Sequence, residues 1–151
     1  MASIAYYSPL YELAPNRGQA AYIARQVVEE KRGQLVAFKT TITPGAALLN
    51  TDVVHVLPVL PAGVVLKDCI IKNDDLDSGT TVTFGFGWTS APTTFLSAST
   101  LFQSANTGTA LTAAQVMGGA ASAAGDELLI TLSADSTTAG TITVMGTLLF
   151  P

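Results

Sequence analysis

Charged residues and cysteine are both scarce in this chain of 151 residues. Asp, Glu, Lys and Arg make up 12% of it, against about a quarter in ordinary soluble domains. The single cysteine, Cys69, excludes an internal disulfide framework. The longest apolar stretches, residues 53–60 and 64–71, are interrupted by histidine, proline or charged residues. They fall far short of the ~20 apolar residues that a membrane-spanning helix needs. The first nine residues lack the basic and apolar regions of a signal peptide.

Hydrophobic residues, by contrast, are abundant. Hydrophobic residues make up 48% of it, and its mean hydropathy is +0.43. A chain of this length forms one domain and can bury a sizeable core without a disulfide or a metal. With so few charges, however, some of its surface must be apolar, and subunit interfaces commonly cover such surface. We therefore expect a protein that assembles rather than a freely diffusing monomer.

Charge and tyrosine are unevenly distributed along the chain. All seven basic residues lie within residues 1–72, whereas residues 73–151 hold six of the eleven acidic residues and no base. This asymmetry indicates that the two segments meet different partners. The pI near 4.6 and the base-free second half argue against direct binding of nucleic acid. All four tyrosines lie within the first 22 residues.

Residues 1–17 are predicted to form an extended arm, because Pro9 and Pro15 restrict the backbone and no helical or strand period is visible. Tyrosine is enriched at protein interfaces, so we expect the arm to dock on a partner or a neighbouring subunit. The alternatives are an arm that folds back onto its own domain or a frayed terminus. Basic residues near the arm could meet an acidic protein surface. The predicted interface residues are Tyr6, Tyr7, Tyr11, Arg17, Tyr22 and Arg25.

Residues 19–31 are the one segment with helical spacing of apolar residues, and Gly33 stands where a helix would end. The β-branched pair Val27 and Val28 also fits a strand. We therefore divide the chain into an N-terminal arm with a short helix, residues 1–34, and a β domain, residues 35–151.

From Leu35 onward the sequence indicates strands. Apolar stretches bounded by Gly, Pro, Asn and Asp predict strands over residues 35–43, 52–57, 64–72, 80–88, 126–133 and 141–150. Residues 93–124 are predicted to hold short turns with one or two weak strands or helical turns, anchored by Phe95-Leu96 and Leu101-Phe102. The absence of strand–helix alternation predicts an all-β antiparallel sandwich. Connections of unequal length favour a jelly roll.

The clearest single pattern lies in residues 80–88. Val82, Phe84, Phe86 and Trp88 alternate with Thr and Gly, so they are predicted to share the buried face of a strand. Gly85 and Gly87 would lie on the opposite face. The Gly-x-Gly pair lacks the third glycine and the strand–helix context of a dinucleotide site. It is more typical of close approach by another backbone.

The side chains that could carry chemistry are few. His55, the only histidine, is predicted to be a strand residue with a backbone partner, and Cys69 a small buried hydrophobic residue. One His and one Cys cannot form a Cys/His zinc site. The acidic segment 73–79 matches a calcium loop only in part and is better explained as a turn. Asp126 and Glu127 stand at a strand start, where solvated acids are common. No catalytic residue, metal or cofactor is predicted.

The order of these features resembles the capsid cement or decoration proteins of tailed bacteriophages, which are small jelly-roll proteins on the outside of the shell, often trimeric. The resemblance covers about residues 35–150. It follows a Pro/Tyr-rich arm and rests on loose patterns at residues 36–48, 50–54, 57–66, 73–80 (Asn73-Asp74-Asp75-Leu76-Asp77-Ser78-Gly79-Thr80), 84–88, 95–100 and 138–144.

The resemblance implies a non-enzymatic virion protein that is assembled in the host cytoplasm. It would sit on the outer surface of the head as a homotrimer, with the major capsid protein as partner and without nucleic acid or membrane. It also implies that the jelly roll makes the subunit contact and that the arm lies across capsid subunits. The alternative is a receptor- or carbohydrate-binding module of a head fibre or tail, for which Trp88 and the acidic turn at 73–79 are the candidate features.

Overall fold

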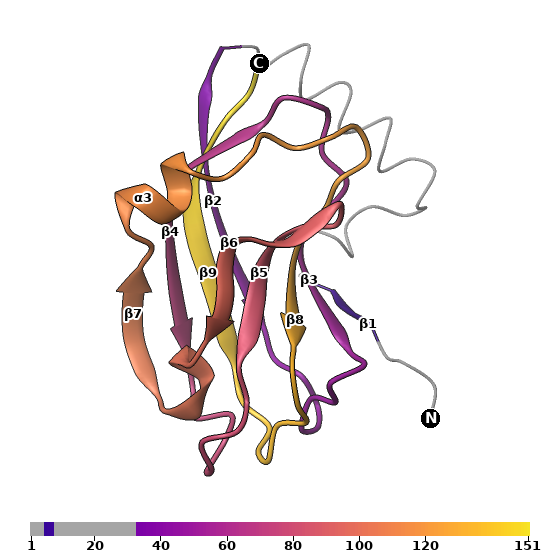
Figure 1. The fold of residues 1–151 in the computed structure, drawn as a ribbon, viewed down its shortest axis with the longest axis vertical. Coiled ribbons are helices and arrows are strands. Elements are labelled where there is room, and N and C mark those ends of the chain that lie inside the picture. The colour runs from indigo at the N-terminus through magenta and orange to yellow at the C-terminus, as the bar shows by residue number, and fades with distance from the viewer. Residues whose placement is uncertain (1–4, 8–32) are drawn as a thin grey trace.

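Two β-sheets packed face to face make up the structure, a computed structural model that describes residues 5–7 and 33–151 (Figure 1). The strands are β1 (Ala5–Tyr7), β2 (Leu35–Ile42), β3 (Val53–Leu57), β4 (Val65–Asn73), β5 (Phe84–Trp88), β6 (Ala91–Ser99), β7 (Asn106–Ala110), β8 (Leu128–Leu132) and β9 (Ile142–Leu149). Two short helices, η1 (Leu101–Gln103) and α3 (Ala113–Met117), flank β7. The predicted all-β sandwich is confirmed.

From β2 to β9, the strands pair from the outside of the series inward, the first with the last and the second with the second last. Strand β2 pairs with β9, β3 with β8, β4 with β7 and β5 with β6, all antiparallel. Additional pairs, β4 with β9 and β5 with β8, close the sheets in the orders β2-β9-β4-β7 and β1-β3-β8-β5-β6. Successive strands therefore cross between the sheets as in a jelly roll.

Strand β1 extends the second sheet at its edge. It pairs in parallel with β3, with Ala5 opposite Val53 and Tyr7 opposite His55. Part of the predicted arm is thus extended and attached to the sandwich. The predicted helix over residues 19–31 lies outside the described residues. Gly33, where that helix was predicted to end, donates its backbone N–H to Phe150 O at 3.0 Å.

Five of the predicted strands appear close to their expected ends, but the segment 80–88 is strand only from Phe84. Thr81 and Val82 donate their backbone N–H groups to a carboxylate oxygen of Asp77 instead, each at 3.0 Å. Residues 93–124 contain η1, β7 and α3, in keeping with the expected weak elements. They also contain most of β6, which is longer than predicted.

The core lies between the sheets and is centred on aromatic side chains. Val82, Phe84, Phe86 and Trp88 are all at most 1% exposed, which confirms the predicted buried face. Phe84 stacks on Phe102 with ring centroids 4.0 Å apart. Trp88 meets the edge of Phe95 at 5.2 Å, so the predicted anchors of the 93–124 segment hold it against the core.

Thr40 on β2 gives a first testable prediction, because its side chain is only 3% exposed and its hydroxyl finds no hydrogen-bond partner among the described residues. A buried hydroxyl without a partner costs free energy. We expect Thr40→Val to raise the free energy of unfolding by about 1 kcal/mol, measured by denaturant titration. The control is Thr41→Val on the outer face, which removes a 3.1 Å hydrogen bond to Thr143 and should give no gain. Equal effects in the two variants would contradict the prediction.

Candidate interaction surfaces

His55 lies on the outer face of β3. Its Nδ1 contacts the Glu127 carboxylate, just ahead of β8, so an acidic side chain is one of its partners. The pairing arises because β3 and β8 are neighbouring strands, with His55 opposite Leu129. His55 and Glu127 thus join two strands beside β1. Their separation along the chain left no local pattern from which the contact could be predicted.

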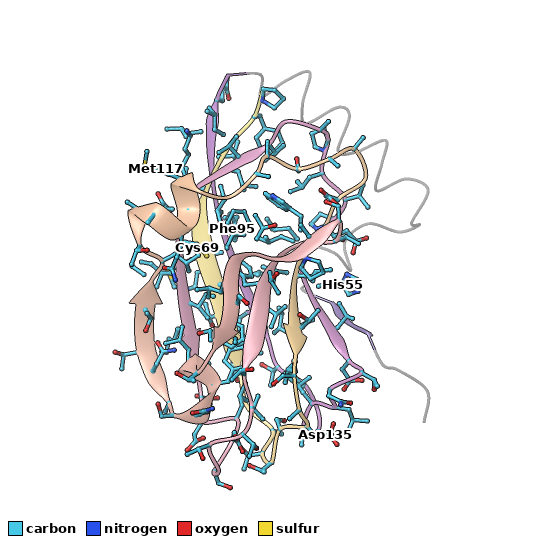
Figure 2. The ribbon with its side chains drawn as sticks, in the orientation of Figure 1. His55, Cys69, Phe95, Met117 and Asp135 are labelled. Carbon is cyan, nitrogen blue, oxygen red and sulfur yellow. The ribbon has the colours of Figure 1, made fainter. Side chains whose placement is uncertain are left out.

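Cys69 is a core residue, as predicted. Its side chain is 1% exposed, and burial, with a smaller contribution from Asp68, raises the pKa of its thiol to about 12. A thiol with such a pKa is a poor nucleophile at neutral pH. Cys69 belongs to β4 and His55 to β3, in different sheets (Figure 2). The structure therefore does not bring these two side chains together.

The acidic turn after β4 uses its carboxylates to hold its own backbone. Asp77 accepts N–H groups from Gly79, Thr81 and Val82. Asp75 accepts from the backbone of Asp77, and Asp74 from the backbone of Thr141. The interpretation of this segment as a connecting turn is confirmed. Across residues 33–151 and β1, no three His, Cys, Asp or Glu side chains gather as a metal site would require.

Asp126 has a similar structural role at the opposite end of the sandwich. It accepts hydrogen bonds from both the backbone N–H and the hydroxyl of Ser90, at 2.9 and 2.8 Å, and from the backbone of Ala123 at 2.6 Å. These bonds tie the β5–β6 turn to the segment before β8. Asp126 is 4% exposed, not the solvated acid that its position in the sequence suggested.

Trp88 is a core residue rather than an exposed platform. It is 1% exposed, and its indole N–H donates to Ala120 O at 2.8 Å. Trp88 and Asp77, the buried carboxylate of the acidic turn, are thus both committed to internal contacts, whereas Asp74 and Asp75 of that turn are exposed. The predicted close approach at the glycines is confirmed, because a Cβ on Gly87 would lie 2.3 Å from Ala91 O.

In the described part of the chain, the most apolar exposed surface is the outward side of the sheet β2-β9-β4-β7, which we term the outer sheet face. One row of neighbours across three strands is Leu35, Leu149 and Val65, and a second is Met145, Ile70 and Ala110. Leu35 is 64% exposed and Ile70 37%. Beside β4, helix α3 carries Met117, which is 83% exposed (Figure 2). This surface was not predicted from the sequence. Its signal there is the alternation in residues 35–42, which places Leu35 on the same strand face as the polar residues Lys39 and Thr41.

The six predicted interface residues stay a prediction. The backbones of Tyr6 and Tyr7 belong to β1, which pairs with β3 at the edge of its sheet. The other four, Tyr11, Arg17, Tyr22 and Arg25, lie outside the described residues. Residues 5–7 of the predicted arm pair with β3 of the same chain, so this part of the arm folds back onto its own domain, the alternative considered above.

Comparison with known proteins gives similarity at the level of the fold. No protein-family model matches the chain, and no curated protein does. A chain in the structure "Cyanophage Pam1 capsid asymmetric unit" is similar with a TM-score of 0.60 and 22% identity over 80% of this chain and 87% of that one. A chain in "Capsid of Ralstonia phage GP4" gives 0.58 and 21% over 80% and 86%. The chain shares its fold with chains of two phage capsids. In the described part of the chain, no helix is long and apolar enough to cross a membrane.

Proposed function

We propose that the protein is a non-enzymatic structural component of a phage virion that binds the outside of the icosahedral capsid and cements neighbouring major capsid subunits. The observation that supports this is the fold likeness, which extends over four fifths of this chain and most of each matched chain, in two phage capsids. The sequence resemblance to cement proteins leads to the same function.

Cementing works by adding interface area that must be broken before the shell can rupture under the pressure of packaged DNA. In this proposal homotrimers sit on the outer surface of the head, after assembly in the host cytoplasm, and contact the major capsid protein without binding DNA or membrane. Arms that span neighbouring subunits gain avidity without a larger domain. The attachment of β1 to β3 supports this role, because it gives the arm a fixed origin on the sandwich.

The test is reconstitution on shells assembled from the major capsid protein of the same phage. We expect the protein to co-sediment with these shells at a saturable ratio and to raise the temperature at which DNA-filled heads lacking it release their DNA, followed with an intercalating dye. Serum albumin added at equal concentration is the control for trapping in the pellet. Failure to co-sediment at micromolar concentration would overturn the proposal.

Removing residues 1–17 should abolish binding to the shell while leaving a folded trimer. The physical reason is that the deletion removes the tyrosine-rich segment and β1 but leaves in place all the core residues found between Ile42 and Phe150. Binding is measured by co-sedimentation, folding by circular dichroism and mass by light scattering. A full-length variant with Tyr6, Tyr7 and Tyr11 replaced by serine separates tyrosine contact from arm length. Unchanged binding of the truncated protein would contradict the role of the arm.

A further inference from the structure

The outer sheet face combines exposed apolar side chains with every basic residue in the described part of the chain. Lys39, Lys67 and Lys72 lie on β2 and β4, and all three are exposed. Lys39 is in register with Met145, which is in register with Ile70, so a lysine borders the second apolar row. An apolar centre with a charged border is the usual composition of a protein interface.

The face also carries one exposed acidic residue, Asp68, beside Lys67 on β4, so three lysines against one aspartate leave it with a net positive charge. This charge restricts how two copies could meet. If two copies packed face to face about a two-fold axis, the lysines of one would approach the lysines of the other, and like charges in contact are unfavourable. A head-to-tail contact avoids this, because the face then meets a different surface of the neighbour. Head-to-tail contacts close into rings when the rotation allows it, and a trimer is such a ring.

The same chain offers an acidic surface for that contact. Asp74 and Asp75 in the β4–β5 connection and Asp135 in the β8–β9 connection are exposed. Both connections lie at the lower end of the molecule, where Asp135 is labelled (Figure 2). We call these three residues the acidic end. The outer sheet face is the outward side of one sheet, whereas the acidic end lies where strands of the sandwich end, so the two surfaces point in different directions (Figure 1). A head-to-tail ring needs two surfaces that are not parallel to each other.

We propose that the outer sheet face of one copy binds the acidic end of the next copy. This inference rests on the proposed assembly of the protein as a trimer, and it identifies which surfaces make the subunit contact. The exposed side chains of Leu35 and Ile70 become covered in the contact. Lys39 and Lys72 approach the carboxylates of the neighbouring copy. The contact also explains how a chain with so few charged residues stays in solution, because assembly covers the apolar face that these residues leave exposed.

The experiment measures the mass of full-length variants by light scattering over a range of concentrations in low salt. We expect the wild type near three times 15.6 kDa. Lys39→Glu should weaken association by roughly tenfold or more, because it sets like charges against each other. Ser97→Glu with Thr100→Glu, at exposed positions on and just after β6, changes the net charge by the same amount and should leave the mass unchanged.

A second pair of variants tests the acidic end. Asp74→Asn with Asp135→Asn keeps an oxygen that can accept the backbone hydrogen bonds from Thr141 and Asn50, and should also weaken association. When this pair is combined with Lys39→Gln, the loss of association should be less than the sum of the separate losses, because both changes remove the same interaction.

An unchanged mass of the Lys39→Glu variant overturns the inference, and so does full additivity of the two losses. So does a monomeric wild type, although shell binding by that monomer would leave the proposed capsid role standing. The inference is also overturned if Lys39→Glu stays trimeric but no longer binds the shell, because the outer sheet face would then contact the shell rather than a neighbouring copy.

Discussion

Gly87→Ala is expected to destabilise the protein by at least about 3 kcal/mol, a large effect for the addition of one methyl group. A Cβ at this position would lie 2.3 Å from Ala91 O, 2.7 Å from Thr94 N and 2.8 Å from the carbonyl carbon of Pro92. All three are backbone atoms, so no side-chain rotation can relieve the overlap. The free energy of unfolding is measured by denaturant titration.

The cause of the crowding at Gly87 is the irregular pairing of β5 with β6. Phe86 pairs with Leu96 and Trp88 with Ala91, so two steps along β5 match five along β6. The additional residues of β6 fold over the outer face of β5 and cover Gly85 and Gly87. Gly45→Ala is the matched control, because Gly45 is exposed, has no positive φ and has nothing within 4 Å of an added Cβ. Similar losses in the two variants would rule out backbone crowding as the cause.

The sandwich could be predicted because its core strands follow a local rule. The alternation of Val82, Phe84, Phe86 and Trp88 places four large side chains on one face without reference to any other part of the chain. In the turn at 73–79, Asp75 and Asp77 likewise accept hydrogen bonds from backbone N–H groups two to five residues further along the chain. These features depend on residues close in the sequence, and they appear where they were expected.

The features that escaped prediction depend on pairing between distant segments. The contact of His55 with Glu127 exists only because β3 and β8 are neighbours. The outer sheet face appears only when β2, β9 and β4 are aligned, which brings Leu35, Leu149 and Val65 into one row. Met117 follows Val116 on a single helical turn, and only the packing of Val116 into the core shows that Met117 faces outward.

The low charge content of the chain and the apolar character of the outer sheet face are related, because a surface with few charged residues leaves some apolar residues exposed. A sandwich with few lysines and glutamates can still cover most of its surface with Ser, Thr, Gly and Ala. Within residues 33–151, the large apolar residues that remain exposed are confined to one sheet and the adjacent helix. Grouping them in one place, next to the lysines of β2 and β4, makes a specific contact possible where scattered apolar residues would favour aggregation.

Asp77→Asn is expected to lower the Tm by about 10 °C or more, because its carboxylate is 0% exposed and organises the connection between β4 and β5. The carboxylate accepts three backbone N–H groups, at 3.0 to 3.1 Å. It also accepts the Thr137 hydroxyl at 3.3 Å. An asparagine amide presents an NH₂ group to some of these donors and leaves them without an acceptor.

The same carboxylate predicts how stability depends on pH. The hydrogen bond from Val82 N–H, followed by those from Gly79 and Thr81, holds the pKa of Asp77 below its ordinary value. The folded state thus favours the ionised form, and its contribution to stability is present above about pH 4 and is lost as the pH falls through the folded-state pKa. Asp77→Asn removes this contribution, so its Tm should fall less steeply than that of the wild type in acid. Asp75→Asn, which keeps an acceptor for the N–H of Asp77, is the control and should follow the wild-type curve. Parallel acid profiles for the wild type and Asp77→Asn would show that Asp77 is not the group responsible.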